Sequence, residues 1–196
     1  MKRISTDAEY LDSGKIVVDA DGIPVNLGYR GTGSPEGKVA APVGSVYTDT
    51  AATNGAIRWV KTSGTGATGW RVSDGDTGWR DISATVSKYK SGNLYLRRTQ
   101  NIVYLYSHNL DLTERTVWQS LGTILPSGFR PFRMMDSRVP LTQGSASSGV
   151  VNVRLQKYDW GAYYLDGHQS HSGGMYFQDS WATEQTWPPT LPGTPA

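Results

Sequence analysis

The segment from residue 94 to residue 106 reads LYLRRTQNIVYLY. Two strand-like runs, LYLRR at 94–98 and IVYLY at 102–106, stand on either side of a short polar connection that ends at Asn101. This pattern is typical of two β-strands joined as a hairpin. Because helix signals are scarce in the rest of the chain, the sequence predicts an all-β protein.

The chain beyond this hairpin carries further strand signals. Val151, Val153 and Leu155 alternate with polar residues, as expected for a strand with one buried face. Short strands at intervals of about 8–12 residues indicate a β-sandwich, which we expect to be jelly-roll-like. Other strands are predicted at 116–121, 139–141, 160–165 and 175–177.

The first part of the chain is richer in Gly and Thr. Strands are predicted at 45–48 and 57–61, with the hairpin signal Asn54-Gly55 between them, and an earlier hairpin is predicted around Asp21-Gly22. The motif TGWR occurs at 68–71 and again at 77–80, which we interpret as two similar strand starts.

The difference in composition and strand pattern between the two parts of the chain predicts two domains. Residues 1–80 would form a hairpin module with Trp59, Trp70 and Trp79 in its small core, and residues 81–196 would form the sandwich. The C-terminal segment TWPPTLPGTPA, residues 186–196, is rich in proline, so we expect it to be extended and to lie outside the sheet.

Composition excludes several classes of protein. The chain has 196 residues, no cysteine, and 19 basic against 17 acidic residues. Without cysteine there are no disulfides and no thiolate metal sites. No apolar run approaches the roughly 20 residues of a membrane helix, and the start of the chain lacks the apolar segment of a signal peptide. A net charge of +2, spread evenly, predicts no nucleic-acid partner.

Signals for catalysis and for metal binding are weak. Carboxylates occur at Asp159, Asp166, Asp179 and Glu184, but no nucleophile elbow, zincin helix or P-loop accompanies them. We therefore expect no enzymatic activity and no cofactor. The pair His168 and His171 has metal-ligand spacing, but we favour a polar loop with two exposed imidazoles and predict no metal site.

Aromatic residues crowd the last forty positions of the chain. Alternation would send some of them into the core, whereas Tyr158, Trp160 and Trp181 are flanked by polar residues and are candidates for exposed rings that stack on sugars. Asp166 and His168 would then bind sugar hydroxyls. The alternative is that these rings fill the core or a contact between subunits. The cluster comprises Tyr158, Trp160, Tyr163, Tyr164, Tyr176, Phe177, Trp181 and Trp187.

The chain resembles a known group of viral proteins. Its ordered series of short motifs, from residue 31 to residue 79, is similar to a module of tail fibres and minor tail proteins of bacteriophages, especially those that infect actinobacteria. The second half resembles fibre head domains, and the resemblance covers roughly residues 28–193. The carrying motifs are GTGSPEG (31–37), APVGSVY (41–47), TAATNG (50–55), Trp59, SGTG (63–66), TGW (68–70), GDTGW (75–79), LRR (96–98), VYL (103–105), LPSGFRP (125–131) and WPPTLPG (187–193).

This resemblance implies a homotrimeric component of the virion tail, made in the cytoplasm of the host bacterium. The N-terminal part would attach to other tail or baseplate proteins, and the C-terminal head would bind a polysaccharide of the host surface. Two alternatives stay open. One is a purely structural baseplate, collar or capsid-decoration protein, and the other is an enzyme that degrades surface polysaccharide.

Overall fold

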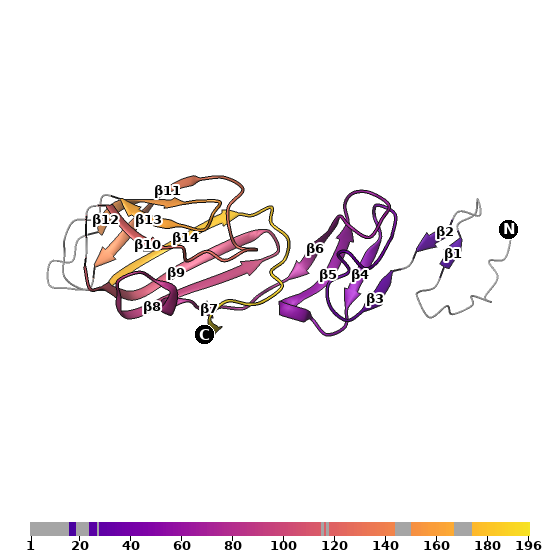
Figure 1. Ribbon diagram of the computed structural model, residues 1–196, viewed down its shortest axis with the longest axis horizontal. Helices are drawn as coiled ribbons and strands as arrows, with labels where there is room; N and C mark the ends of the chain where they lie inside the picture. Colours follow the sequence, from indigo (N-terminus) through magenta and orange to yellow (C-terminus); the bar gives the residue numbers. More distant parts are fainter. Residues whose placement is uncertain are drawn as a thin grey trace. The chain divides into compact units, whose positions relative to one another are not determined.

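The computed structural model describes residues 16–18, 24–26, 28–114, 116, 118–143, 150–166 and 174–196. Half of the chain is strand and the helical segments are single short turns, so the all-β prediction is confirmed. The chain divides into two compact units, Met1–Gly75 and Asp76–Ala196 (Figure 1). No helix in the described part of the chain is long and apolar enough to cross a membrane.

The first unit contains a two-stranded sheet and a four-stranded sheet, ordered β1-β2 and β3-β4-β5-β6. β1 and β2 pair antiparallel, as predicted for the earlier hairpin, although Asp21-Gly22 lies outside the described residues. β4 and β5 also pair antiparallel, and Asn54 takes a left-handed φ of 52° in the turn between them. The strands are β1 (Ile16–Val18), β2 (Pro24–Asn26), β3 (Tyr29–Gly31), β4 (Val46–Asp49), β5 (Ala56–Lys61) and β6 (Trp70–Gly75).

Trp70 organises the small core of the first unit. Its ring meets Tyr29 and Tyr47 edge-on, with centroids 6.2 Å and 6.1 Å away. Its backbone N–H donates to the carboxylate of Glu36, and its indole N–H donates to the carbonyl of Val39. Trp70 and Trp59 are both buried, which confirms their prediction as core residues.

The second unit is built on one sheet of nine strands, ordered β10-β13-β12-β11-β14-β9-β8-β7-β15. β8 and β9 form the long hairpin predicted from residues 94–106. The other predicted strands are present as β10 to β14. The strands are β7 (Arg80–Asp81), β8 (Tyr89–Thr99), β9 (Ile102–Leu112), β10 (Trp118–Gly122), β11 (Met135–Gln143), β12 (Val150–Lys157), β13 (Tyr163–Asp166), β14 (Met175–Ala182) and β15 (Thr194–Pro195).

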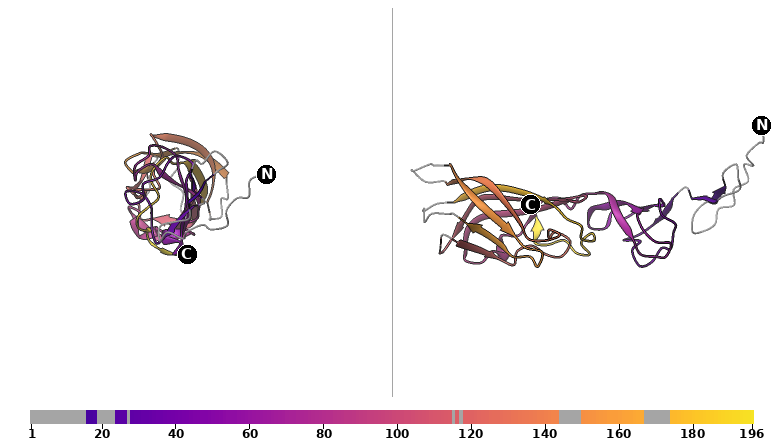
Figure 2. Two further views of the ribbon diagram at one scale, coloured as in Figure 1. Left: turned by 90° about the vertical axis from the view of Figure 1, so that its right-hand side faces the viewer. Right: turned by 90° about the horizontal axis from the view of Figure 1, so that it is seen from above.

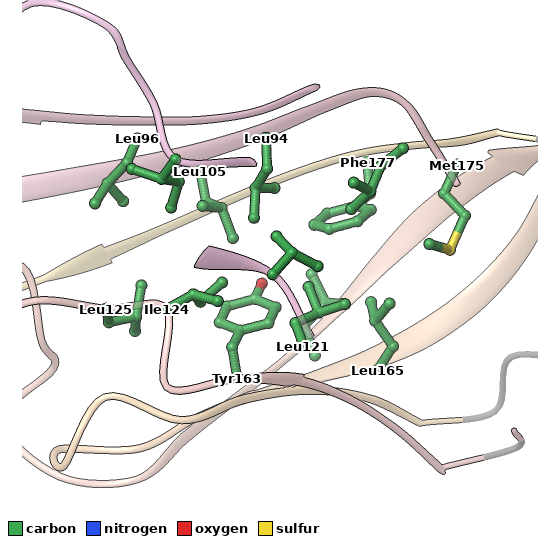
Figure 3. Close-up of a cluster of buried hydrophobic side chains, with 14 of the residues drawn as sticks. Leu94, Leu96, Leu105, Leu121, Ile124, Leu125, Tyr163, Leu165, Met175 and Phe177 are labelled. Atoms are coloured by element: carbon green, nitrogen blue, oxygen red, sulfur yellow. The ribbon is translucent and has the colours of Figure 1, made fainter. Parts of the chain in front are cut away.

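This sheet folds over its own apolar face, in agreement with the predicted sandwich. β8, β9 and β14 form one layer, and β10 to β13 form the other (Figures 1 and 2). The registered pairs between β11 and β14 are Thr142 with Tyr176 and Gln143 with Met175. Figure 3 shows the core, in which leucines of β8 and β9 point toward Tyr163 and Leu165 of the opposite layer.

The proline-rich C-terminus differs from its prediction. It does not lie outside the sheet, because Thr194 and Pro195 pair with Asp81 and Arg80 of β7. This strand, β15, is the last of the sheet, a position where proline is tolerated because one side of the strand needs no backbone donor. Arg80 fixes the approach to β15 by donating to the carbonyls of Pro192 and Gly193.

Candidate functional site: an aromatic row on the outer face of the second unit

Four aromatic side chains form a continuous line on the outer face of the β10–β13 layer. Ring centroids are 5.6 Å apart for Trp118 and Tyr164, 5.6 Å for Tyr164 and Tyr158, and 5.4 Å for Tyr158 and Trp160. We call these four residues the aromatic row. The two tryptophans at its ends are 44% and 51% exposed, so their ring faces are open to solvent within this chain.

Strand pairing sets the order of the row. β13 lies between β10 and β12, and Trp118 of β10 stands opposite Asp166 while Ser120 stands opposite Tyr164. The neighbouring side chains Leu165 and Leu121 point into the core. Alternation therefore turns Trp118 and Tyr164 outward onto the same face.

A tight turn after β12 carries the other two rings. The N–H of Gly161 donates to the carbonyl of Tyr158, and the N–H of Tyr158 donates to the carbonyl of Ala162. Gly161 has a φ of 102°, and a Cβ there would meet the carbonyl oxygen of Leu125 at 2.5 Å. Only glycine suits this position, and the turn projects Trp160 next to Tyr158.

Charged and polar groups border the row. The guanidinium of Arg154 donates to the carboxylate of Asp136 at 2.5 Å and lies 3.8 Å from the carboxylate of Asp166. The hydrogen bond to Asp136 raises the pKa of Arg154 above its usual range. Gln156 is buried, with its side-chain oxygen 3.5 Å from the hydroxyl of Tyr158. The row thus combines apolar ring faces with hydrogen-bonding groups.

The structure brings together some of the predicted residues and separates others. Tyr158 and Trp160 lie in the row, and Asp166 lies beside it. Trp181 does not, which corrects the expectation that it is exposed: it is 3% exposed, and its indole N–H donates to the carbonyl of Phe129. Side chains alternate between buried and more exposed along β14, and Trp181 lies on the buried face, which packs against the core. His168 and His171 lie outside the described residues.

Trp118 and Tyr164 complete the row but were not predicted as site residues. Tyr164 stood in the aromatic cluster, and Trp118 stood in a predicted strand without a role. The missing signal is the pairing of β10 with β13, which joins segments about forty residues apart. A single sequence does not reveal such a pairing.

Another group of rings covers the outer face of the other layer. Tyr95 and Tyr106 stack at 6.3 Å with an interplanar angle of 13°, Tyr106 lies 6.5 Å from His108, and His108 lies 5.4 Å from Tyr176. We call these four residues the tyrosine face. Trp79 belongs to the second unit and packs against Tyr106, with ring centroids 6.5 Å apart. The prediction that it lies in the core of the first unit is therefore wrong.

Charge on the tyrosine face is balanced locally. Arg97 lies over Trp79, with its guanidinium carbon 5.8 Å from the ring centroid, and donates two hydrogen bonds to Asp76. The hydrogen bond from Arg97 is the main reason that the pKa of Asp76 is lowered below its ordinary value. The face is therefore largely aromatic, with one neutralised ion pair at its edge.

A buried polar cluster joins the two layers of the sandwich. Lys157 donates to Ser137 at 2.5 Å and to the two oxygens of Asp179 at 2.9 Å and 3.2 Å, and Tyr163 donates to Asp179 at 2.7 Å. The lysine and the aspartate side chains are 1% and 2% exposed. Ser137 in turn donates to Asp179 at 2.7 Å. Because the ion pair is buried and its groups hydrogen-bond to one another, the arrangement favours a structural role.

The remaining carboxylates of the sequence analysis do not converge. Asp159 and Glu184 are exposed on loops, and Asp179 belongs to the buried cluster. Among the described residues, no group of three or more His, Asp or Glu side chains is placed to hold a metal ion. The aromatic row is consequently the strongest candidate for a ligand site.

Comparisons with protein-family models, with curated proteins and with solved structures found no match. The resemblance to phage tail proteins therefore stays a prediction. In the described part of the chain, the outer faces of the second unit carry two groups of contacting aromatic rings.

Proposed function

We propose that this protein is a tail-fibre or minor tail protein of a bacteriophage that adheres to a glycan of the host surface through the aromatic row. The observation that supports this proposal is the line of four contacting rings with two half-exposed tryptophans at its ends. Ring faces stack on the C–H faces of sugars, and the groups around Arg154 and Asp166 provide hydrogen bonds to hydroxyls.

Weak single contacts are sufficient for this role. A row on an open sheet face buries less of a ligand than an enclosed pocket does. Several copies on one particle would bind together, so that their combined avidity exceeds the affinity of one site. Adhesion in this form requires no catalytic step, and we propose no enzymatic activity.

The tyrosine face suits contacts between copies of the chain, and we propose a homotrimer built on it. Interface centres are enriched in aromatic residues and depleted of unpaired charge, and the ion pair of Arg97 with Asp76 leaves this face without net charge at its edge. The aromatic row is less suited, because burying Arg154, Asp136 and Asp166 against protein would cost desolvation energy.

A second candidate function is that of a purely structural baseplate, collar or decoration protein. It is favoured by a different observation: Phe132, Met134 and Met135 are 67%, 45% and 36% exposed within four residues. Exposed apolar side chains in such a group are typical of protein contacts. In that case the rings of the row would also be covered by neighbouring proteins and would not meet sugar.

Cell binding separates the two candidates. We expect the fluorescently labelled full-length chain to stain cells of an actinobacterial panel, and the double variant Trp118→Ala/Trp160→Ala to lose that staining. Tyr89→Ala, which removes an exposed ring outside the row, is the control and should stain normally. Equal staining by the double variant and the unaltered chain, or no staining of any strain, would count against adhesion through the row.

A further inference from the structure

The aromatic row has a direction, and this direction restricts its ligand. Trp118 stands at the level of Asp166, Tyr164 lies two residues earlier on β13, and Tyr158 stands at the level of Ala162. Its length is set by three successive ring-centroid distances of 5.6, 5.6 and 5.4 Å, from Trp118 to Trp160. The rings come from β10, β13 and the turn after β12, so the row runs across neighbouring strands of this layer.

Successive rings along one axis suit a ligand that is itself a chain. A single sugar covers about one ring face, and it would leave the rest of the row in water. A polysaccharide that lies along the row would contact three or four rings in turn, including both of the exposed tryptophans.

The charges around the row restrict the ligand further. The described charged side chains around it are three cations, Arg130, Arg138 and Arg154, and three anions, Asp136, Asp159 and Asp166, so their charges balance. Arg154 is engaged by Asp136 at 2.5 Å. Arg138 lies on β11, two strands away from Tyr164.

Phosphate and carboxylate groups are recognised by guanidinium groups that are free to form two parallel hydrogen bonds. Next to the row, Arg154 already donates twice to one carboxylate, and a second carboxylate lies beside it. Arg130, beside the turn at Gly161, donates its Nε–H to the carbonyl of Leu125. A polyanion would gain no net attraction from these balanced charges, whereas an uncharged polyol would find carboxylate acceptors for its hydroxyls.

Resting on the proposed function, we infer that the ligand of the aromatic row is an uncharged polysaccharide bound along several consecutive sugars, and not an anionic wall polymer or a single terminal sugar. The inference goes beyond adhesion because it specifies the charge of the receptor and the way in which it is bound.

Two binding experiments test it on the full-length chain. Walls of a strain that the protein stains are separated by anion exchange into uncharged and anionic polysaccharide fractions, and the binding of each is measured by tryptophan fluorescence and calorimetry. We expect the uncharged fraction to bind. Trp118→Ala and Trp160→Ala should each weaken it about tenfold, which corresponds to ~1.4 kcal/mol, and Tyr89→Ala should not. In a length series from this fraction, affinity should rise with each added sugar until the row is filled.

The outcomes separate this inference from the proposed function. Binding of only the anionic fraction, with staining intact, would refute the charge assignment and leave adhesion standing. Equal affinity for one sugar and for a long oligomer would refute binding along the chain. Staining without binding of either fraction would indicate a receptor that is not a polysaccharide and would overturn the inference. Absence of staining on every strain would instead remove the proposed function.

Discussion

The guanidinium carbon of Arg98 lies 4.9 Å from the ring centroid of Trp187. Arg98 is buried, although it carries a full charge, and it donates to the carbonyls of Gln100, Gly128, Gln185 and Thr186. One side chain of β8 thus holds its own hairpin turn, the loop after β10 and the C-terminal segment. The cation–π contact with Trp187 supplements these hydrogen bonds.

Replacement of Arg98 by Met is expected to destabilise the second unit strongly. The change would leave several buried carbonyls without donors, and hydrogen bonds to a charged group contribute about 1.5–3 kcal/mol each. We expect a loss of at least about 3 kcal/mol in the free energy of unfolding, measured by urea denaturation. Arg133→Met, at an exposed position, is the control, and a similar stability for the two variants would contradict the role of Arg98.

The buried ion pair of Lys157 and Asp179 gives a prediction for a double-mutant cycle. Asp179→Asn leaves a buried ammonium without its counter-charge and should cost about 3–5 kcal/mol. The double variant Lys157→Met/Asp179→Asn removes that charge, so it should be more stable than Asp179→Asn alone. Thermal unfolding of the four proteins of the cycle, including Lys157→Met, gives the coupling energy. A double variant that is the least stable of the four would show that the charge is not the source of the loss.

Tyr163 predicts how stability changes at high pH. Burial, the negative charge of Asp179 and the hydrogen bond to it raise the pKa of Tyr163 well above its ordinary value of 10.0. The folded state therefore keeps the phenol proton when the unfolded state loses it. The stabilisation is complete below about pH 10 and is lost as the pH rises through the folded pKa.

Unfolding measured between pH 8 and pH 12, a range chosen around the ordinary tyrosine pKa of about 10, should show this loss, and Tyr163→Phe should reduce it. In an ultraviolet titration of the folded proteins, Tyr163→Phe should show one fewer tyrosine that ionises only at high pH. Tyr47, whose pKa is raised by burial and by Asp49, remains as an internal reference. An unchanged slope in Tyr163→Phe would rule out Tyr163 as its origin.

Gly161→Ala should displace the turn that carries Trp160. The added Cβ would meet the oxygen of Leu125 at 2.5 Å and Nε of Arg130 at 3.1 Å, at a φ of 102°. Backbone strain of this type costs about 1–3 kcal/mol, and staining of cells should weaken. Gly44→Ala, at a comparable φ of 89°, has no atom within 4 Å of the new Cβ. Equal losses in both variants would mean that strain, and not the contact with Leu125, is responsible.

The proposed trimer predicts a solution mass of three times the chain mass of 21.4 kDa. Tyr106→Glu places a charge at the centre of the tyrosine face and should yield monomers in sedimentation equilibrium. Trp118→Glu alters the opposite outer face and should leave the trimer intact. An unaltered chain that sediments as a monomer would contradict the proposed assembly, and dissociation by Trp118→Glu alone would assign it to the other face.

The strands of the second unit were predictable because their patterns are local. Val153 and Leu155 are buried and Arg154 between them points outward, as alternation required. The hairpin 94–106 needed only a short polar connection between two apolar runs. Propensity and period act over a few residues, so one sequence contains them in full.

The candidate site was predicted only in part, because it depends on pairings between distant segments. Tyr158 and Trp160 are close in the chain and were identified together. Trp118 lies next to them because β10 pairs with β13. Trp181 lies apart from them because its side chain is on the buried face of β14. The C-terminal strand was missed for the same reason, since Pro195 finds its partner at Arg80.

The outermost strand of the nine-stranded sheet ends in a residue that has no backbone donor. With Pro195 in place, β15 presents an incomplete ladder to any strand that approaches it from outside. If this donor were present, the exposed edge strands of neighbouring copies could pair with one another, as strands do in amyloid. The final dipeptide of the sheet therefore disfavours pairing of this edge with a strand of another copy.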